Sequence, residues 1–476
     1  MRIAIIGASA AGIFSALVLR RAGHDILLIE QDKFAIAEDA EAAARTAFRT
    51  GAPQIVQPHA ILPRCRELLL KHLPDVYCNL LAAGAVEAPL QSQMPPSLTD
   101  KEVWPGDERL TMLMTRRSTF DWTLRRAIAN EDRVQHLCGT HATGLIADGQ
   151  RVPHNNGVRT DQGDVSADLV VDASGYRTRI DHWLVDLGTS QPNVQRAECG
   201  IAYFSRHYRM RHEARAPGPP TTRMLLALDE FTVGIWGCDR ETMQIAIGPL
   251  ASDHRFKTVR DPKIFTSVLR TIPAFSAWLD VLDPVSDVFV MGSVQNTLRR
   301  LVVDGLPVAT GLHAVGDSVC TTNPTLGRGL PLALSGAIHL RDLIEAFGRQ
   351  WTEQAIEYDT RIGDDTAPFY EDQALIDSGR LAILRHRIFD APAPKPPAVN
   401  PDRVSFSELR TAAIFDPGLF RAFWRLYGMP EKPDRVYNDP AVVACTRQTL
   451  RQLDAIPAIA QPSREQLVAA LISECD

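Results

Sequence analysis

The sequence lacks the cysteine pattern of a zinc-binding or disulfide-rich protein. Its eight cysteines are scattered along 476 residues, and no two of them form a Cys-x-x-Cys pair. Neither a zinc site nor a disulfide framework is predicted, and free thiols favour a cytoplasmic location. The motifs HExxH and GxSxG are also absent, so we expect no metal and no nucleophilic side chain in the chemistry of this protein.

An excess of positive charge and long apolar runs are missing as well. The net charge of −6 argues against a general nucleic-acid-binding protein. No uninterrupted apolar stretch reaches about 18 residues, so no transmembrane helix is predicted. The apolar N-terminus follows only Met1 and Arg2 and is broken by glycines, unlike a signal peptide. The length fits about two or three domains, and a hydrophobic content of 45% is enough to give them a core.

Residues 2–30 contain the clearest motif. An apolar strand leads into a turn between Gly7 and Gly12, followed by a helix and a second strand that ends at Glu30. This order is the βαβ unit that binds a dinucleotide, with the helix N-terminus facing the pyrophosphate. Glu30 lies 18 residues after Gly12, where a carboxylate accepts hydrogen bonds from ribose hydroxyls. Ser9 replaces the middle glycine, and the motif alone does not distinguish FAD from NAD(P).

Two later strands are predicted to end at polar segments that contain glycine. One runs into Asp172-Ala-Ser-Gly175, and the other runs into Gly316-Asp317. A loop with a proline then leads to Gly327-Arg-Gly329, which precedes a predicted helix over 330–348. Asp317 suits a sugar-like hydroxyl, and the helix N-terminus would face developing negative charge. Each segment taken alone is also compatible with an ordinary turn.

The pattern of predicted strands and helices divides the chain into three parts. Strand-like segments rich in aromatic and β-branched residues predict an antiparallel sheet, which we interpret as a substrate-binding domain at 191–300. This domain is inserted into a dinucleotide-binding domain formed by 1–190 and 301–348. Residues 349–476 are predicted to be mostly helical, and we identify no chemistry in them. The expected fold class is α/β, with a Rossmann-like domain, an inserted antiparallel-sheet domain and a helical C-terminal region.

Several local elements are predicted with defined bounds. A helix is expected over 117–127 with Ser118 as its N-cap. A single amphipathic helix is expected over 262–282, and a strand over 285–294. The basic helix predicted over 375–389 is interpreted as a packed helix with a solvated basic face.

The order and separation of these motifs resemble those of a known family. The chain is similar to the FAD-dependent monooxygenase superfamily built on the para-hydroxybenzoate hydroxylase fold, which includes flavin-dependent halogenases and geranylgeranyl-reductase-like proteins. The resemblance covers about residues 1–345. It rests on the glycine turn with Glu30, on Arg117-x-x-Phe-Asp-x-x-Leu124, on Asp172-Ala-Ser-Gly175, and on Gly316-Asp317 with Pro324-x-x-Gly327-x-Gly329.

The resemblance implies that FAD is the cofactor. By this likeness the glycine turn lines the pyrophosphate, Glu30 binds the adenosine ribose and Arg117 contacts the phosphate or ribose region. Asp317 binds the ribityl chain or the pyrophosphate side, and the start of the later helix lies under the N1–C2=O edge of the isoalloxazine. The cofactor-binding residues implied are Gly7, Ser9, Ala10, Ala11, Gly12, Glu30, Gln31, Arg117, Gly175, Asp317, Pro324, Gly327, Gly329 and Leu330.

The same resemblance implies a reaction with oxygen. Reduced FAD would form a C4a-hydroperoxide with O2, and one oxygen atom would pass to a small hydrophobic substrate of the kind found in natural-product biosynthesis. Electrons come from NAD(P)H or from a partner flavin reductase. Ser174 stands where the aromatic hydroxylases carry an aspartate tied to NAD(P)H binding, which weakens the case for direct NAD(P)H binding.

Substrate-side residues are less defined by the sequence. Arg49, His59 and Tyr203 are candidates, because loops after the nucleotide domain and the covering sheet border the flavin ring in similar proteins. For each of them a purely structural role is the alternative. His313 lies within an apolar strand, and we interpret it as a core histidine.

Three functions remain open at this stage. The leading hypothesis is a monooxygenase that hydroxylates or epoxidises a hydrophobic or aromatic molecule. The second is a flavin-dependent reductase of isoprenoid-like double bonds, and the third is a flavin-binding protein without enzymatic activity. Halogenation ranks low because the Trp-x-Trp-x-Ile-Pro signature of halogenases is absent.

Overall fold

A five-stranded parallel sheet forms the centre of the dinucleotide-binding part. The computed structural model describes residues 1–33, 35–49, 51–218, 223–292, 294–395, 400–453 and 459–472. The sheet has the order β20-β9-β1-β2-β5, and every neighbouring pair is parallel. Its strands are β1 (Arg2–Ile6), β2 (Asp25–Glu30), β5 (Val134–Cys138), β9 (Leu169–Asp172) and β20 (Leu312–Ala314). The central strands are buried runs of Ile, Leu and Val, as expected for a parallel sheet covered on both faces.

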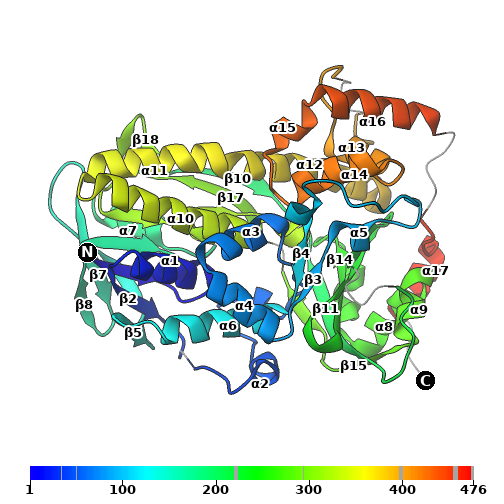
Figure 1. Ribbon diagram of the computed structural model, residues 1–476, viewed down its shortest axis with the longest axis horizontal. Helices are drawn as coiled ribbons and strands as arrows, with labels where there is room; N and C mark the ends of the chain where they lie inside the picture. The colour runs from blue at the N-terminus through cyan, green and yellow to red at the C-terminus, as the bar shows by residue number, and fades with distance from the viewer. Residues whose placement is uncertain are drawn as a thin grey trace.

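Helices from distant parts of the chain cover this sheet. The helix α1 (Ala10–Arg21) packs between α6 (Arg117–Ala129) and α10 (Gly329–Phe347), and α11 (Trp351–Asp365) lies beside α10 (Figure 1). The close packing of α1 depends on Gly12, because a β-carbon there would lie 1.8 Å from the carbonyl oxygen of Gly7. The glycine turn therefore fixes how the N-terminus of α1 sits over the sheet.

A six-stranded antiparallel sheet forms the second large layer. Its main path is β12-β13-β14-β11-β15, and β16 pairs with β11. The strands are β11 (Tyr203–Met210), β12 (Arg223–Ala227), β13 (Phe231–Gly237), β14 (Thr242–Pro249), β15 (Leu282–Pro284) and β16 (Phe289–Met291). One face packs on α8 (Pro262–Arg270) and α9 (Pro273–Leu279). The C-terminal helix α17 (Arg464–Ile472) joins the same core, at the right of Figure 1.

Smaller sheets and helices connect these layers. The small sheets contain β3 (Val86–Ala88), β4 (Met112–Met114), β6 (Ala142–Ala147), β7 (Asn155–Thr160), β8 (Gly163–Ser166), β10 (Asn193–Glu198), β17 (Gln295–Arg300), β18 (Val302–Val303), β19 (Leu306–Pro307) and β21 (Cys320–Thr321). The remaining helices are α2 (Ala40–Arg45), α3 (Pro63–His72), α4 (Pro74–Ala82), α5 (Leu90–Gln93), α7 (Ile180–Asp186), α12 (Ala367–Phe389), α13 (Phe406–Ala413), α14 (Pro417–Tyr427), α15 (Pro433–Tyr437) and α16 (Pro440–Gln452). The α/β class and the helical C-terminal region predicted from the sequence are confirmed.

Three local predictions are corrected by the structure. The helix expected over 262–282 is two helices, since Pro273 begins α9 and cannot supply the backbone N–H that would continue α8. The strand expected over 285–294 is reduced to β16. Ser118 is not an N-cap, because α6 already begins at Arg117 and Arg116 occupies the cap position.

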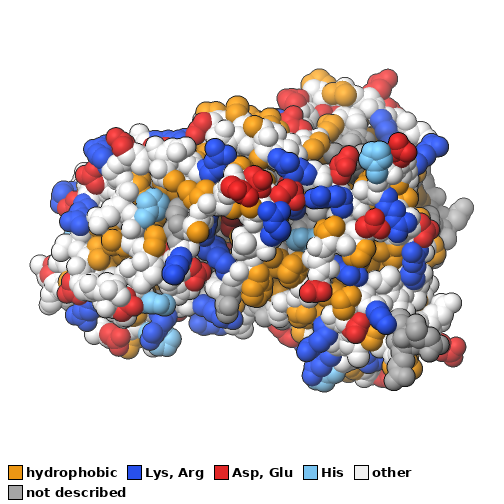
Figure 2. Space-filling view, turned by 90° about the horizontal axis from the view of Figure 1, so that it is seen from below, with side chains coloured by type: hydrophobic (Ala, Val, Ile, Leu, Met, Phe, Trp, Pro, Cys, Tyr) orange, Lys and Arg blue, Asp and Glu red, His pale blue; other side chains and the backbone are white. Residues whose placement is uncertain are grey.

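The surface carries charges of both signs. Figure 2 shows acidic and basic side chains intermixed across the face seen from below. Within the ranges that the structure describes, no helix is both long enough and apolar enough to cross a bilayer.

Candidate functional site

The carboxyl ends of the parallel strands bring the sequence motifs together at one edge of the sheet. Gly7 follows β1, Glu30 ends β2, Asp172 ends β9 and Asp317 follows β20, and parallel strands point their carboxyl ends in one direction. Gly7 adopts φ +100°, and a β-carbon there would lie 2.5 Å from the carbonyl oxygen of Ala173. The turn therefore packs directly against the backbone at the end of β9, with no room for a side chain at Gly7.

The N-terminus of α1 is open to a ligand. Ser9 occupies the N-cap position, but its side chain makes no capping hydrogen bond. The free N–H groups at the start of a helix and its positive dipole end favour a phosphate. Ala10 and Ala11, the first two residues of α1, have small side chains, and a β-carbon at Gly316 would lie 2.5 Å from the β-carbon of Ala11. The entrance to α1 is thus narrow and lined by backbone.

Arg49 reaches this loop from the segment that follows β2. Its guanidinium donates to Ser9 Oγ at 3.1 Å and lies 3.7 Å from the carboxylate of Asp32. Its Nε is buried and has no hydrogen-bond partner among the described residues. Predicted on the substrate side, Arg49 lies instead at the glycine turn, where its unused donor suits a phosphate oxygen.

Glu30 stabilises the glycine turn through hydrogen bonds. Its carboxylate accepts hydrogen bonds from the backbone N–H groups of Ala8 at 2.7 Å and Asp32 at 3.0 Å. The residue is 7% exposed, whereas Gln31 beside it is exposed. Two fixed backbone donors hold the carboxylate at the end of β2, where a ribose would meet it.

Arg117 begins α6, and its charge acts on Asp317 at the sheet edge. It donates from Nε to Asp121 Oδ1 at 2.6 Å, and its Nη1 lies 3.4 Å from His59 Nε2. Burial, with the nearby Arg117 charge as a second cause, lowers the pKa of His59 from 6.5 to about 4. His59, predicted on the substrate side, is therefore a neutral partner of Arg117 at neutral pH.

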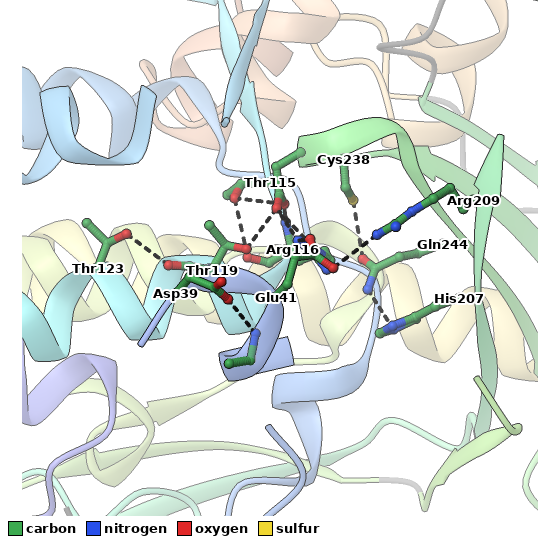
Figure 3. Close-up of polar contacts among 12 residues, drawn as sticks. Asp39, Glu41, Thr115, Arg116, Thr119, Thr123, His207, Arg209, Cys238 and Gln244 are labelled. Atoms are coloured by element: carbon green, nitrogen blue, oxygen red, sulfur yellow. Dashed lines mark hydrogen bonds and ion pairs between the residues drawn. The ribbon is translucent and has the colours of Figure 1, made fainter. Parts of the chain in front are cut away.

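The preceding residue, Arg116, anchors α6 to the antiparallel sheet. Its Nε donates to Asp239 Oδ2 at 3.0 Å, and Glu41 from α2 bridges Arg116 and Arg209 of β11 (Figure 3). Asp239 is fully buried and also accepts from Thr119 Oγ1 at 2.8 Å. This network fixes the start of α6, and with it the position of Arg117.

Asp317 lies in a confined place at the sheet edge. Burial raises its pKa to about 6, although the positive charge of Arg117 opposes the shift. A β-carbon on Gly329, the first residue of α10, would lie 3.7 Å from Asp317 Oδ1. No side chain caps α10, and its first residue lies beside Asp317. Gly175 donates its N–H to Ser318 Oγ at 3.0 Å, which ties the middle motif to this segment.

The loop between Asp317 and α10 borders a pocket on its other side. Pro324 begins a short 3-10 turn, Gly327 ends it with φ +72°, and Leu330 is buried in the core behind it. The pocket lies between this loop and the antiparallel sheet. Its lining residues are Gln57, Pro58, Ile201, Tyr203, Leu225, Thr232, Gly234, Trp236, Ala246, Gly248, Met291, Pro324, Thr325 and Arg380.

Tyr203 is the substrate-side candidate that the structure places in this pocket. Its hydroxyl bonds Asn323 Oδ1 and lies 3.1 Å from Thr325 Oγ1, and burial raises its pKa well above 10. Trp236 rests over Gly234, since a β-carbon on that glycine would lie 2.4 Å from the indole ring. The pocket is therefore largely apolar, with one fixed phenol beside the Pro324 loop.

Two pocket residues were missed by the sequence reasoning. Gln57 is 5% exposed, and neither atom of its amide has a hydrogen-bond partner among the described residues. Arg380 comes from α12, a helix for which no chemistry was predicted. Neither belongs to a motif, and only the folding of α12 and the 51–59 loop against the sheet brings them together.

Solved structures that match the fold include FAD-dependent monooxygenases and flavin-dependent halogenases, so the chain has the para-hydroxybenzoate hydroxylase-like fold expected from the motifs. The flavin-dependent brominase Bmp2 matches with a TM-score of 0.62 and 17% identity, over 95% of this chain and 99% of Bmp2. PqsL of Pseudomonas aeruginosa, described as a probable FAD-dependent monooxygenase, matches with a TM-score of 0.55 and 15% identity, over 82% of this chain and 100% of PqsL.

A further solved structure and one sequence relative extend this comparison. The myxobacterial chondrochloren halogenase CndH has a TM-score of 0.55 and 15% identity, over 98% of each chain. Protein Rv3254 of Mycobacterium tuberculosis is 24% identical over 465 residues, which is 92% of this chain and 91% of that protein. No protein-family model matches the sequence.

Proposed function

We propose that this protein binds FAD and is a flavin-dependent monooxygenase that adds one oxygen atom from O2 to a small hydrophobic or aromatic molecule. The observation that carries the proposal is the meeting of four distant segments at one sheet edge: the Gly7 turn, Glu30, Arg117 and Asp317. Their donors and acceptors match the parts of a dinucleotide in order. The similarity to flavin-dependent enzymes supports the same cofactor.

Each end of the cofactor has residues suited to it. The uncapped N-terminus of α1 and the unused Nε of Arg49 would hold the pyrophosphate, and Glu30 would accept the ribose hydroxyls. Asp317 would accept a hydroxyl of the ribityl chain. The N-terminus of α10, at Gly329, would stabilise negative charge on the reduced ring.

The pocket indicates what the cofactor and the chain would each contribute to the reaction. Reduced FAD supplies the reaction with O2, and the chain supplies binding, orientation and exclusion of water. The apolar walls around Trp236 and Met291 would hold the substrate against the Pro324 loop. Tyr203, fixed by Asn323 and Thr325, would donate or accept one hydrogen bond to a polar group of the substrate.

The domain assignment and the electron donor belong to the same proposal. The parallel sheet with its helices would form the FAD-binding domain at 1–190 and 301–348, and the antiparallel sheet at 191–300 would cover the substrate. Ser174 donates to Asp172 Oδ1 at 2.6 Å, so it serves the turn after β9. NAD(P)H is one candidate donor, and a partner flavin reductase is the other.

A direct experiment tests the proposal. The purified protein is expected to carry a yellow chromophore with flavin absorption, and denaturation is expected to release FAD. Substrates that stimulate oxygen consumption are then reacted under ¹⁸O2, and product mass should rise by one labelled oxygen atom. A protein that neither retains nor takes up FAD would contradict the cofactor assignment, and an unlabelled reduced product would favour the reductase of isoprenoid-like double bonds.

Halogenation is the second candidate that a specific observation favours. Bmp2 and CndH share the fold over nearly the whole chain. Against it, the Trp-x-Trp-x-Ile-Pro signature is absent from the sequence. Adding bromide or chloride to the oxygen assay separates the two, because a halogenase forms a halogenated product that contains no oxygen from ¹⁸O2.

A further inference from the structure

One arginine, Arg380, lines the pocket. Arg380 lies on α12 and lines the pocket together with Tyr203 and Pro324. Its guanidinium donates to the hydroxyl of Thr232, and it forms no ion pair with any carboxylate of the described residues. A guanidinium has five N–H donors, so most of its hydrogen-bonding capacity is unused.

Two further arginines surround this position. Arg410 of α13 donates to the carbonyl oxygen of Leu225, at 3.3 Å. Arg223 at the start of β12 lies over the ring of Tyr427 at 4.5 Å and donates to its hydroxyl. Burial lowers the pKa of Arg410, and the charges of Arg223 and Arg380 add to the effect. The charges of Arg223 and Arg380 therefore repel that of Arg410, and none of the three guanidinium groups forms an ion pair with a carboxylate of the described residues.

Elsewhere this chain pairs its buried arginines. Arg116 meets Asp239, Arg328 meets Asp372, and Arg421 meets Asp107. Arg380, Arg410 and Arg223 are only half-buried, and they form no such pair among the described residues. Arg380 lies where a ligand is expected to bind.

The nearest acidic group is already occupied. Asp377, one turn before Arg380, accepts hydrogen bonds from Asn296 at 2.7 Å, Asn323 at 2.8 Å and Gln373 at 3.1 Å. Burial raises its pKa to about 6. Asp377 is therefore committed to three amide groups. Its charge attracts Arg380, but the two side chains form no direct ion pair among the contacts of the described residues, so the guanidinium can still meet a ligand.

We infer that the substrate is a carboxylate: its carboxyl group pairs with Arg380, and its oxidisable ring or double bond lies against the Pro324 loop. The planar guanidinium fork matches a carboxylate in two hydrogen bonds. Gln57, with a buried and unpaired amide on the same pocket, supplies a second polar contact near the reacting end. The inference rests on the proposed function for the reaction, but the carboxylate subsite is testable without it.

The test compares acids with their neutral amides. Binding of benzoate, benzamide, 2-naphthoate and 2-naphthamide to the purified full-length protein is measured by calorimetry, with and without added FAD. We expect each acid to bind roughly 10-fold or more tightly than its amide. Arg380→Gln should remove that preference, and Arg387→Gln, an exposed arginine on the same helix that pairs with Asp229, should retain it.

The outcomes separate the two proposals. Equal affinity for acid and amide, or an acid preference that survives Arg380→Gln, overturns the carboxylate subsite. Because the acid–amide comparison uses the unaltered protein, it remains decisive if Arg380→Gln fails to fold. Failure to bind FAD contradicts the proposed function alone, since calorimetry reads carboxylate binding in its absence.

Discussion

Replacing Arg117 with methionine tests whether this residue binds the cofactor or only balances a buried charge. Its side chain is 8% exposed and pairs with Asp121, which is 6% exposed. Removing one partner of a buried ion pair costs about 3–5 kcal/mol in unfolding free energy. The remaining contact of Asp121, with Arg49 at 4.0 Å, is too long to replace the lost pair. We expect Arg117→Met to be strongly destabilised.

The double variant Arg117→Met/Asp121→Asn separates the two roles. It removes both charges, so most of the stability lost in the single variant should return. The contact from Arg117 to the cofactor stays absent in both. A hydrogen bond to a charged group contributes about 1.5–3 kcal/mol, so FAD affinity should fall roughly 10- to 150-fold in both variants.

The assay pairs urea unfolding with FAD titration. Arg421→Met is the matched control, because Arg421 and Asp107 form an equally buried pair, 6% and 3% exposed, on α14 and a distant turn. This control should lose comparable stability and keep its FAD affinity. If the double variant recovers both stability and FAD affinity, Arg117 acts only as the partner of Asp121 and the proposed phosphate contact is refuted.

Two further perturbations address packing and pH. Gly12→Ala places a β-carbon 1.8 Å from the carbonyl oxygen of Gly7, so α1 must shift and FAD retention after gel filtration should be lost, whereas Gly149→Ala, with open space around it, should retain FAD. His313 is buried against Gln354, and burial lowers its pKa from 6.5 to about 4. As the pH falls, His313 therefore takes up a proton in the unfolded chain before it does so in the folded chain. The free energy of unfolding should decrease as the pH drops from 6.5 toward 4. His313→Gln should flatten this dependence by roughly 3 kcal/mol in unfolding experiments across that range, and an unchanged slope would contradict it.

Local sequence signals explain what could be predicted. The β1–α1–β2 unit is encoded in thirty consecutive residues, where apolar runs and two glycines specify strand, turn and helix. The core role of His313 is confirmed by its 2% exposure and its bond to Gln354. The predicted bounds of a helix were wrong where a single residue interrupted it. Pro273 divides the continuous helix expected over 262–282 into two.

Long-range contacts explain what could not be predicted. Arg49 and His59 follow β2 in a loop that contacts Ser9 and Arg117, so their position at the carboxyl edge of the parallel sheet has no signature in their own sequence neighbourhood. The C-terminal helix α17 returns to the antiparallel sheet, which periodicity alone does not indicate. Such contacts depend on tertiary packing, so they cannot be predicted from the spacing of residues in the sequence.

The role proposed for Arg380 predicts an effect on stability opposite to that of a structural arginine. A structural arginine such as Arg421, paired with Asp107, should lower stability when removed, whereas a guanidinium held for an absent ligand opposes folding. We therefore expect Arg380→Met to raise the unfolding free energy of the ligand-free protein by on the order of 1 kcal/mol, partly offset by the lost hydrogen bond to Thr232. Thermal unfolding without and with 2-naphthoate measures the effect of Arg380 on the stability of the free protein and its effect on the stabilisation by the ligand. The variant should melt higher than the parent alone and gain less from the acid, and a lower melting temperature without ligand would show that Arg380 holds the fold.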